Sequence, residues 1–225
     1  MNELVEKIGQ CVERGKINKA SPHPNDMKGM DGAEELTKQA LETAVEPNAI
    51  LQACTDGMQH IGERFSKNEV FVPELLMAAK AMHTVMVQLE PFFKSGSVKV
   101  KGKFVLGTVT GDLHDIGKNL VRMIVEGNGW QVVDLGADVK PAKFLEAIKN
   151  NPGCIVGLST LLTTTMVNMS KTVQEIKANF PTTSIIVGGA PLTTEAALKM
   201  GADGYSPDPQ GAVAFLNKVS AVNIV

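Results

Sequence analysis

Aromatic side chains make up only 4% of this 225-residue sequence, and its three cysteines (Cys11, Cys54 and Cys154) lie far apart. Their spacing forms neither a CxxC pair nor a zinc-ligand pattern, which argues against a zinc or iron–sulfur centre within the chain. We therefore expect the cysteines to be small buried side chains.

Strong charge and long apolar runs are also missing. The formal net charge is −2, which gives no electrostatic footprint for nucleic acid or a membrane surface. No apolar run reaches the roughly 18 residues that a membrane span needs, and the first residues carry no secretion signal. The sequence thus predicts a cytoplasmic protein with no nucleic-acid partner and no membrane partner.

Several common nucleotide-binding and catalytic motifs are absent. No GxGxxG follows a predicted strand, and no GxSxG elbow or kinase set occurs. The stretch from Gly111 to Gly117-Lys118 fails as a P-loop, because five residues separate its glycines and Asn119 follows the lysine. The P-loop needs four intervening residues and a Ser or Thr at that place.

The first part of the chain, residues 1–93, has helical periodicity. A short helix ends near Gly15, residues 16–32 break any period, and further helices begin at Ala33, Pro47 and Pro73. The last of these has apolar residues at alternating steps of four and three, namely Leu75, Ala79, Met82, Met86, Leu89 and Phe93. This spacing is typical of a bundle seam and predicts a four-helix bundle.

The pattern changes after residues 94–102, a small, polar and basic stretch that predicts a linker. In residues 103–225, β-type runs alternate with helical ones. The predicted strands are 103–109, 131–135, 154–158, 184–187 and 204–206. This alternation predicts an α/β domain built on a doubly wound, five-stranded parallel sheet, which follows the N-terminal all-α domain.

The loops after the predicted strands carry polar residues that can line one crevice, because parallel strands end at the same edge of a sheet. Asp112 and His114 follow the first strand, a hydroxyl-rich run from Ser159 to Thr165 follows the third, and Gly188-Gly189 follows the fourth. An imidazole can bind a metal through one nitrogen while a carboxylate holds the N–H of the other.

Asp112-x-His114-x-x-Gly117 resembles the cobalamin-binding motif of corrinoid proteins that bind B12 base-off, with a protein histidine as the lower cobalt ligand. Ser159-x-Leu161 matches the second B12 motif of that family and Gly188-Gly189 the third. The resemblance is to the small corrinoid carriers of anaerobic methyltransferase systems and to the cobalamin module of methionine synthase. It implies a flavodoxin- or Rossmann-like B12-binding domain beneath a helical cap.

The resemblance also implies roles for individual residues. His114 would be the metal ligand, with Asp112 and the Thr165 hydroxyl taking up or releasing a proton as that bond changes. The cobalamin, as methylcobalamin or a related corrinoid, would contact Gly111, Asp112, His114, Asp115, Ile116, Gly117, Ser159, Leu161, Thr163, Thr165, Gly188 and Gly189. From the cap, Phe71, Leu75 and Met82 would cover the upper corrin face.

Structural alternatives exist for these residues. Ser159 and Thr165 could begin a helix, and Gly188-Gly189 could be only a turn at the end of a strand. The Asp112–His114 pair could be a structural hydrogen bond, and Leu75 and Met82 could be bundle core. The loop at 16–32 is longer than the one that most members of the family carry.

The function that the resemblance implies is that of a methyl carrier with no complete active site of its own. Its partners would be a substrate-specific methyltransferase, a methyltransferase to tetrahydrofolate or a thiol, and a reductive activator. The alternatives are a B12-binding subunit of an adenosylcobalamin-dependent mutase, a cobalamin-responsive sensor, or a domain for another nucleotide-like ligand. The sequence identifies neither the methyl donor nor the acceptor.

Overall fold

A computed structural model describes residues 3–94 and 100–222. It divides into two compact units, a helical unit (residues 1–100 with 126–129) and an α/β unit (residues 101–125 with 130–225). Part of the predicted linker, residues 95–99, lies outside the described residues.

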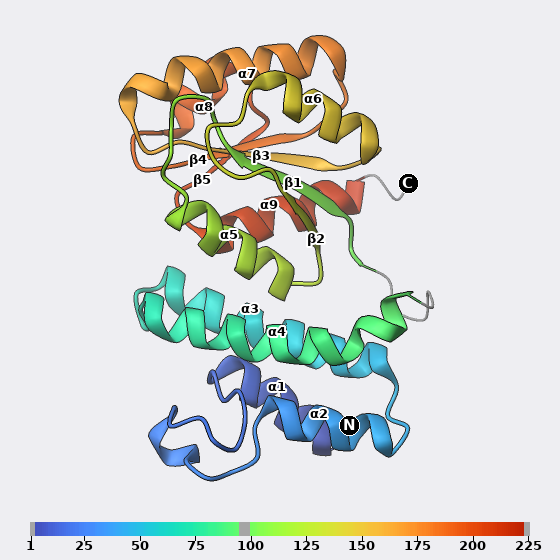
Figure 1. Cartoon of the computed structure of the whole chain (residues 1–225). Coiled ribbons are helices and arrows are strands. Elements are labelled where there is room, and N and C mark those ends of the chain that lie inside the picture. Colours follow the sequence, from blue (N-terminus) through green and yellow to red (C-terminus); the bar gives the residue numbers. More distant parts are fainter. Residues whose placement is uncertain (1–2, 95–99, 223–225) are drawn as a thin grey trace. The chain divides into compact units, whose positions relative to one another are not determined.

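The helical unit has the four predicted helices (Figure 1). They are α1 (Glu3–Glu13), α2 (Ala33–Glu42), α3 (Pro47–Ser66) and α4 (Val72–Lys94). Pro47 is at the first position of α3, where its missing N–H costs no helical hydrogen bond. The aperiodic loop contains one short 3-10 helix, η1 (Asn25–Met27), and its ends are joined by a hydrogen bond of 3.0 Å from Ala33 N–H to the Lys16 carbonyl.

The apolar seam of α4 is buried, as its spacing predicts. Leu75, Ala79, Met82 and Leu89 are each at most 3% exposed, while Met86 is half-buried. The three cysteines are free and buried, which confirms their expected role as small apolar side chains. Burial raises the pKa of the Cys11 thiol to about 11, so this group stays protonated near neutral pH.

Helices α1 and α3 approach each other closely through two glycines. A Cβ added to Gly57 would lie 2.5 Å from the Gly9 carbonyl oxygen, and one added to Gly9 would lie 2.7 Å from the Ala53 carbonyl oxygen. Both obstacles are backbone atoms, which cannot rotate away. The absence of side chains at these positions therefore sets the distance between the two helices.

The α/β unit contains a parallel sheet with the strand order β2-β1-β3-β4-β5 in the part of the chain that the structure describes. The strands are β1 (Lys103–Thr108), β2 (Gln131–Asp134), β3 (Ile155–Ser159), β4 (Ile185–Gly188) and β5 (Gly204–Ser206). Each lies within one residue of its predicted bounds. The predicted doubly wound architecture is confirmed.

Helices cover both faces of the sheet (Figure 1). One face carries α6 (Pro141–Asn150), α7 (Met166–Asn179) and α8 (Thr194–Met200), and the other carries α5 (Ile116–Gly127) and α9 (Pro209–Val222). Helix α7 is preceded by a 3-10 turn, η2 (Thr163–Thr165), at the end of the hydroxyl-rich run. Threonine hydroxyls compete for backbone groups at such a helix start, and the Thr165 hydroxyl donates to the Leu162 carbonyl at 2.9 Å.

The strand order determines where a ligand can bind. The chain runs from β1 outward to β2 and then returns to β3 on the other side of β1. Loops that leave neighbouring strands in opposite directions open a crevice at the carboxyl edge of the sheet. The loops after β1 and β3 meet at this switch point.

Residues 3–94 and 100–222 lack two further features. No helix among them is long and apolar enough to cross a membrane. They contain no cluster of three or more His, Cys, Asp or Glu side chains that could hold a metal ion.

The contact between α1 and α3 gives a test of the helical packing. We expect Gly57→Ala to lower the free energy of unfolding by about 1–3 kcal/mol, because the added methyl group forces the two backbones apart. Gln59→Ala, on the exposed side of the same helix, should change it by less than about 0.5 kcal/mol. Urea unfolding followed by circular dichroism measures both, and a Gly57→Ala protein as stable as the parent would contradict the packing described.

Candidate functional site

The candidate site is at the switch point between β1 and β3. The loop after β1 carries Asp112 and His114, and the loop after β3 carries the hydroxyl-rich run. Asp112 is fully buried between these loops, whereas the His114 side chain is 51% exposed. The two loops, distant in sequence, therefore lie together, as their places after parallel strands predict.

One oxygen of the Asp112 carboxylate holds His114. Oδ1 accepts hydrogen bonds from the His114 backbone N–H at 3.0 Å and from the ring Nδ1 at 2.7 Å. Because an ionised carboxylate only accepts, Nδ1 carries the ring proton. The other ring nitrogen, Nε2, is left as the position with a free electron pair, which is the form of imidazole that binds metals.

The other oxygen, Oδ2, is held by the loop after β3. It accepts from the Leu161 N–H at 2.6 Å, the Leu162 N–H at 3.2 Å and the Thr160 hydroxyl at 2.9 Å. The Thr165 hydroxyl is 3.2 Å from Oδ2 and 2.5 Å from the Thr160 hydroxyl. The structure thus brings Thr165 to Asp112, as the motif implied, with Thr160 beside it.

These donors determine the charge of Asp112. Burial by itself would raise the pKa of this carboxyl group, but hydrogen bonds from the Leu161 and His114 backbones, the His114 ring and Thr160 outweigh it. The pKa of Asp112 is therefore held far below its ordinary value of 3.8. The group is a fixed negative charge next to the imidazole at any pH near neutrality.

Exposed apolar side chains flank His114 in its own loop and occur again on the neighbouring loop after β3. Leu113 is 77% exposed and Ile116 is 86% exposed. On the loop after β3, Leu161 is 46% exposed and Leu162 is 38% exposed. Large apolar side chains that are exposed together mark a surface that binds an apolar partner or ligand.

The remaining predicted residues of the loop after β1 have distinct environments. Gly111 has a φ of +84°, which favours glycine, and its N–H donates to Asp138. The Asp115 carboxylate accepts a hydrogen bond of 2.9 Å from the Asn119 amide at the start of α5. A Cβ on Gly117 would meet nothing within 4 Å, so this position borders open space.

The predicted residues after β3 and β4 also lie at this edge. Ser159 is half-buried and ends β3, and Thr163 is exposed. Gly188 ends β4, and the following Gly189 has a φ of +137°. A Cβ on Gly189 would overlap the Thr160 carbonyl oxygen. Glycine at this position is thus required by the packing of the loop that holds Asp112.

The three residues predicted in the helical unit divide by exposure. Phe71, just before α4, is 67% exposed. Leu75 and Met82 are 1% and 0% exposed and belong to the buried seam of α4, which favours the alternative that they are bundle core. His60 and His83 are on exposed positions of α3 and α4.

Two residues of the site were missed by the sequence analysis. Thr160 was part of the hydroxyl-rich run but was not singled out, although its 1% exposure and its bond to Asp112 make it central. Asp138, in the loop after β2, accepts a hydrogen bond of 2.7 Å from Gly111 N–H. The sequence could have indicated Asp138 as a site residue, because it follows a predicted strand and so lies at the same edge of the sheet.

Comparison with known proteins identifies the family of this chain. Residues 102–214 match a family model described as a B12 binding domain, and residues 30–90 match a second model with the same description. The chain is 37% identical over 195 residues to trimethylamine corrinoid protein 1 of Methanosarcina acetivorans, an alignment that covers 84% of this chain and 89% of that protein.

Two solved structures are similar along nearly the whole chain. A cobalamin-binding protein from Desulfitobacterium hafniense DCB-2 has a TM-score of 0.73 and 29% identity, with 95% of this chain and 97% of that chain covered. The methanol:cobalamin methyltransferase complex MtaBC from Methanosarcina barkeri gives a TM-score of 0.79 at 25% identity, covering 98% of this chain and 80% of that chain. From its matched domains and these relatives, the chain belongs to the B12-binding corrinoid proteins of methyltransferase systems.

Proposed function

We propose that this protein binds cobalamin base-off, with His114 as the lower axial ligand, and carries a methyl group between two partner methyltransferases. The observation that carries the proposal is the pairing of His114 Nδ1 with the buried Asp112 carboxylate at 2.7 Å. This pairing fixes the tautomer in which Nε2 can bind a metal, on a ring that is half exposed.

The residues around His114 fit a corrinoid. A single imidazole ligand suits a metal whose other ligands come from a macrocycle rather than from the protein. The exposed side chains of Leu113, Ile116, Leu161 and Leu162 offer an apolar bed for such a macrocycle. In base-off binding the nucleotide tail of cobalamin leaves the cobalt. The hydroxyl-rich loop after β3 and the glycines after β4 could bind this tail.

When bound, the corrinoid supplies a cobalt centre that can accept a methyl group from one partner and give it to another. His114 would support this exchange by holding the corrinoid through Nε2 or by releasing it. Asp112 keeps the Nδ1 proton in place in either case.

The strongly lowered pKa of Asp112 supports a refined division of roles. Its oxygens already accept hydrogen bonds from both loops, so protonating this carboxyl group would break several of them. We infer that Asp112 stays ionised throughout. The Thr160 hydroxyl then stabilises this charge by donating to Oδ2, and the Thr165 hydroxyl lies beside it.

The helical unit supports a covering role through Phe71. This aromatic side chain is 67% exposed and precedes Val72, which is also exposed at 42%. An apolar cover over the upper corrin face would exclude water from the reacting centre. The match of residues 30–90 to a B12 binding model favours this cap, and with it the carrier over the mutase alternative.

The relatives suggest which partners to try first. The similarity to a trimethylamine corrinoid protein makes methylamine-specific methyltransferases the first candidates. The similarity to the methanol:cobalamin methyltransferase complex makes a methanol-specific methyltransferase the second candidate. A methyltransferase to tetrahydrofolate or a thiol and a reductive activator complete the proposed set.

The axial ligand gives the first test of the proposal. After reconstitution with hydroxocobalamin, the parent protein should retain a visible corrinoid spectrum with imidazole-ligand features. His114→Ala should lose those features. Its affinity for the cofactor should fall by more than the roughly 10–100-fold loss that follows removal of a residue hydrogen-bonded to a metal ligand. His83→Ala, an exposed histidine of α4, is the matched control. Unchanged axial ligation in His114→Ala would reject the assignment.

The Thr160 hydroxyl gives a test of the charge of Asp112. Because the folded-state pKa of Asp112 lies below 3.8, its carboxylate stabilises the fold above about pH 4, and this contribution is lost as the pH falls through the folded-state pKa. Thr160→Val removes a donor, so the pKa should rise towards its ordinary value.

We expect Thr160→Val to unfold at a higher pH than the parent during acid titration, and to be less stable at pH 7 by about 1–3 kcal/mol. Thr164→Val, at an exposed neighbouring position, is the control. Circular dichroism of the apo-protein against pH measures the transition. Equal acid midpoints for Thr160→Val and the parent would show that this hydroxyl does not support the carboxylate.

Methyl transfer gives the test of the carrier function itself. The reduced holo-protein, mixed with a methylamine-specific methyltransferase and trimethylamine labelled in its methyl groups, should carry the label through gel filtration. The apo-protein in the same mixture should not, because the acceptor is the bound corrinoid. Repeating the mixture with labelled methanol and its methyltransferase distinguishes the two donors. No retained label with either donor would argue against the carrier assignment.

A further inference from the structure

The loop after β2 runs beside the segment that carries Asp112 and His114. Thr108 N–H donates to the Gly136 carbonyl at 3.0 Å, and Val139 N–H donates to the Thr108 carbonyl at 2.9 Å. Val109 and Val139 form an isolated parallel bridge. The pairing of β1 with the β2 side of the sheet thus continues beyond the ends of both strands.

Asp138 holds the turn at Gly111 and Asp112 through two reciprocal bonds. Its Oδ1 accepts from Gly111 N–H at 2.7 Å, and its own N–H donates to the Asp112 carbonyl at 3.0 Å. Asp138 adopts a φ of +53°, a left-handed conformation that Asp and Asn tolerate better than most residues. This conformation is part of what directs both of its groups to the same turn.

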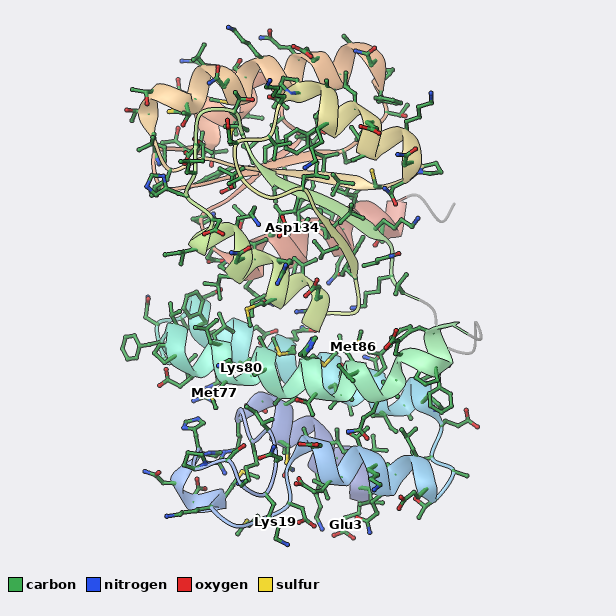
Figure 2. All side chains as sticks on the ribbon, in the orientation of Figure 1. Glu3, Lys19, Met77, Lys80, Met86 and Asp134 are labelled. Atoms are coloured by element: carbon green, nitrogen blue, oxygen red, sulfur yellow. The ribbon has the colours of Figure 1, made fainter. Side chains whose placement is uncertain are left out.

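The base of this loop is itself anchored by a buried ion pair. Lys118, in the first turn of α5, places Nζ 2.8 Å from both carboxylate oxygens of Asp134 (labelled in Figure 2), and its side chain is only 1% exposed. Asp134 also accepts from Gly136 N–H at 2.9 Å. The loop is therefore fixed at its start to the helix that follows His114.

From this arrangement we propose that Asp138 is a positioning residue for His114, acting through the Gly111–Asp112 turn. The inference rests on the proposed role of His114 as the axial ligand. The loop after β3 holds the Asp112 carboxylate from one side, and Asp138 holds the Asp112 backbone from the other. Together they fix both the position of this residue and the direction in which its Oδ1 meets the imidazole.

The Asp112–His114 hydrogen bond tolerates only small displacements of its two groups, which is why the position of the turn matters. A ligand must be held within about 0.5 Å of its productive position by residues that are themselves fixed. Without the Asp138 carboxylate, the Gly111 N–H would bond to water, and the turn could rotate about a glycine with a φ of +84°. Such rotation would lengthen the Asp112–His114 bond and release the ring to its other tautomer.

Three substitutions of Asp138 and one control at Asn68 separate the effect of the carboxylate from that of the backbone conformation. Asp138→Gly keeps the left-handed conformation at no steric cost but removes the acceptor. Asp138→Asn keeps both the conformation and a side-chain oxygen at the same distance. Asn68→Gly is the matched control, because Asn68 has a similar φ of +58° in the helical unit. Asp138→Ser is a second variant that removes the carboxylate, and thermal unfolding of each apo-protein verifies folding.

Two measurements report on His114. The first is the affinity for hydroxocobalamin and the imidazole-ligand features of the visible spectrum. The second is the nitrogen-15 NMR spectrum of the apo-protein at pH 8 with labelled histidine, which distinguishes Nδ1–H from Nε2–H rings and is assigned with His114→Ala. It needs no cofactor, so it tests the positioning of the ring even if cobalamin binds in another way.

We expect Asp138→Gly and Asp138→Ser to bind hydroxocobalamin roughly tenfold more weakly, with reduced imidazole-ligand features. The His114 ring should shift from the Nδ1–H form to a mixture of tautomers. Asp138→Asn and Asn68→Gly should match the parent in both measurements. Parent-like values in Asp138→Gly would overturn the proposal, and so would an Asp138→Asn protein as impaired as Asp138→Gly.

A parent spectrum without imidazole-ligand features would reject the proposed function and leave the NMR comparison to decide this inference. In that case a tautomer change in Asp138→Gly would still support positioning by Asp138. An unchanged tautomer would overturn it.

Discussion

The buried charge of Asp112 is the constraint on which the rest of the site depends. A carboxylate removed from water is costly unless hydrogen-bond donors replace the lost hydration. Here the donors belong to His114 and to a loop that lies 48 to 50 residues away in the chain. The β1–β3 pairing brings that loop into reach, and the glycine at position 189 lets the Thr160 carbonyl fit beneath it.

The elements of the fold were predictable because each has a clear local pattern. The steps of three and four in α4, the apolar runs of the strands and Pro47 at the start of α3 all match the structure. The Asp112–His114 contact was predictable because it joins residues two positions apart. The hydroxyl groups that approach Asp112 were harder to predict, because only the folded chain decides which side chains of the run after β3 turn inward.

Thr160 illustrates this limit. Its neighbour Ser159 is only half-buried, while Thr160 is 1% exposed, and nothing in the run of hydroxyls distinguishes them. The Leu161 and Leu162 N–H donors leave no trace in a sequence, because every such residue has one. Likewise, the apolar character of Leu75, Met82 and Phe71 could not separate core from surface, since both roles select the same residue types.

The apolar side chains around His114 have a consequence for the protein in the cell. Leu113, Ile116, Leu161 and Leu162 are exposed, although burying each would be favourable by about 1.5–3 kcal/mol. An unloaded chain therefore displays an adhesive surface that can associate with other hydrophobic surfaces. Under the proposed binding of cobalamin at His114, synthesis of this protein beyond the supply of cofactor would produce a pool prone to self-association, so cofactor supply would limit the amount that remains dispersed.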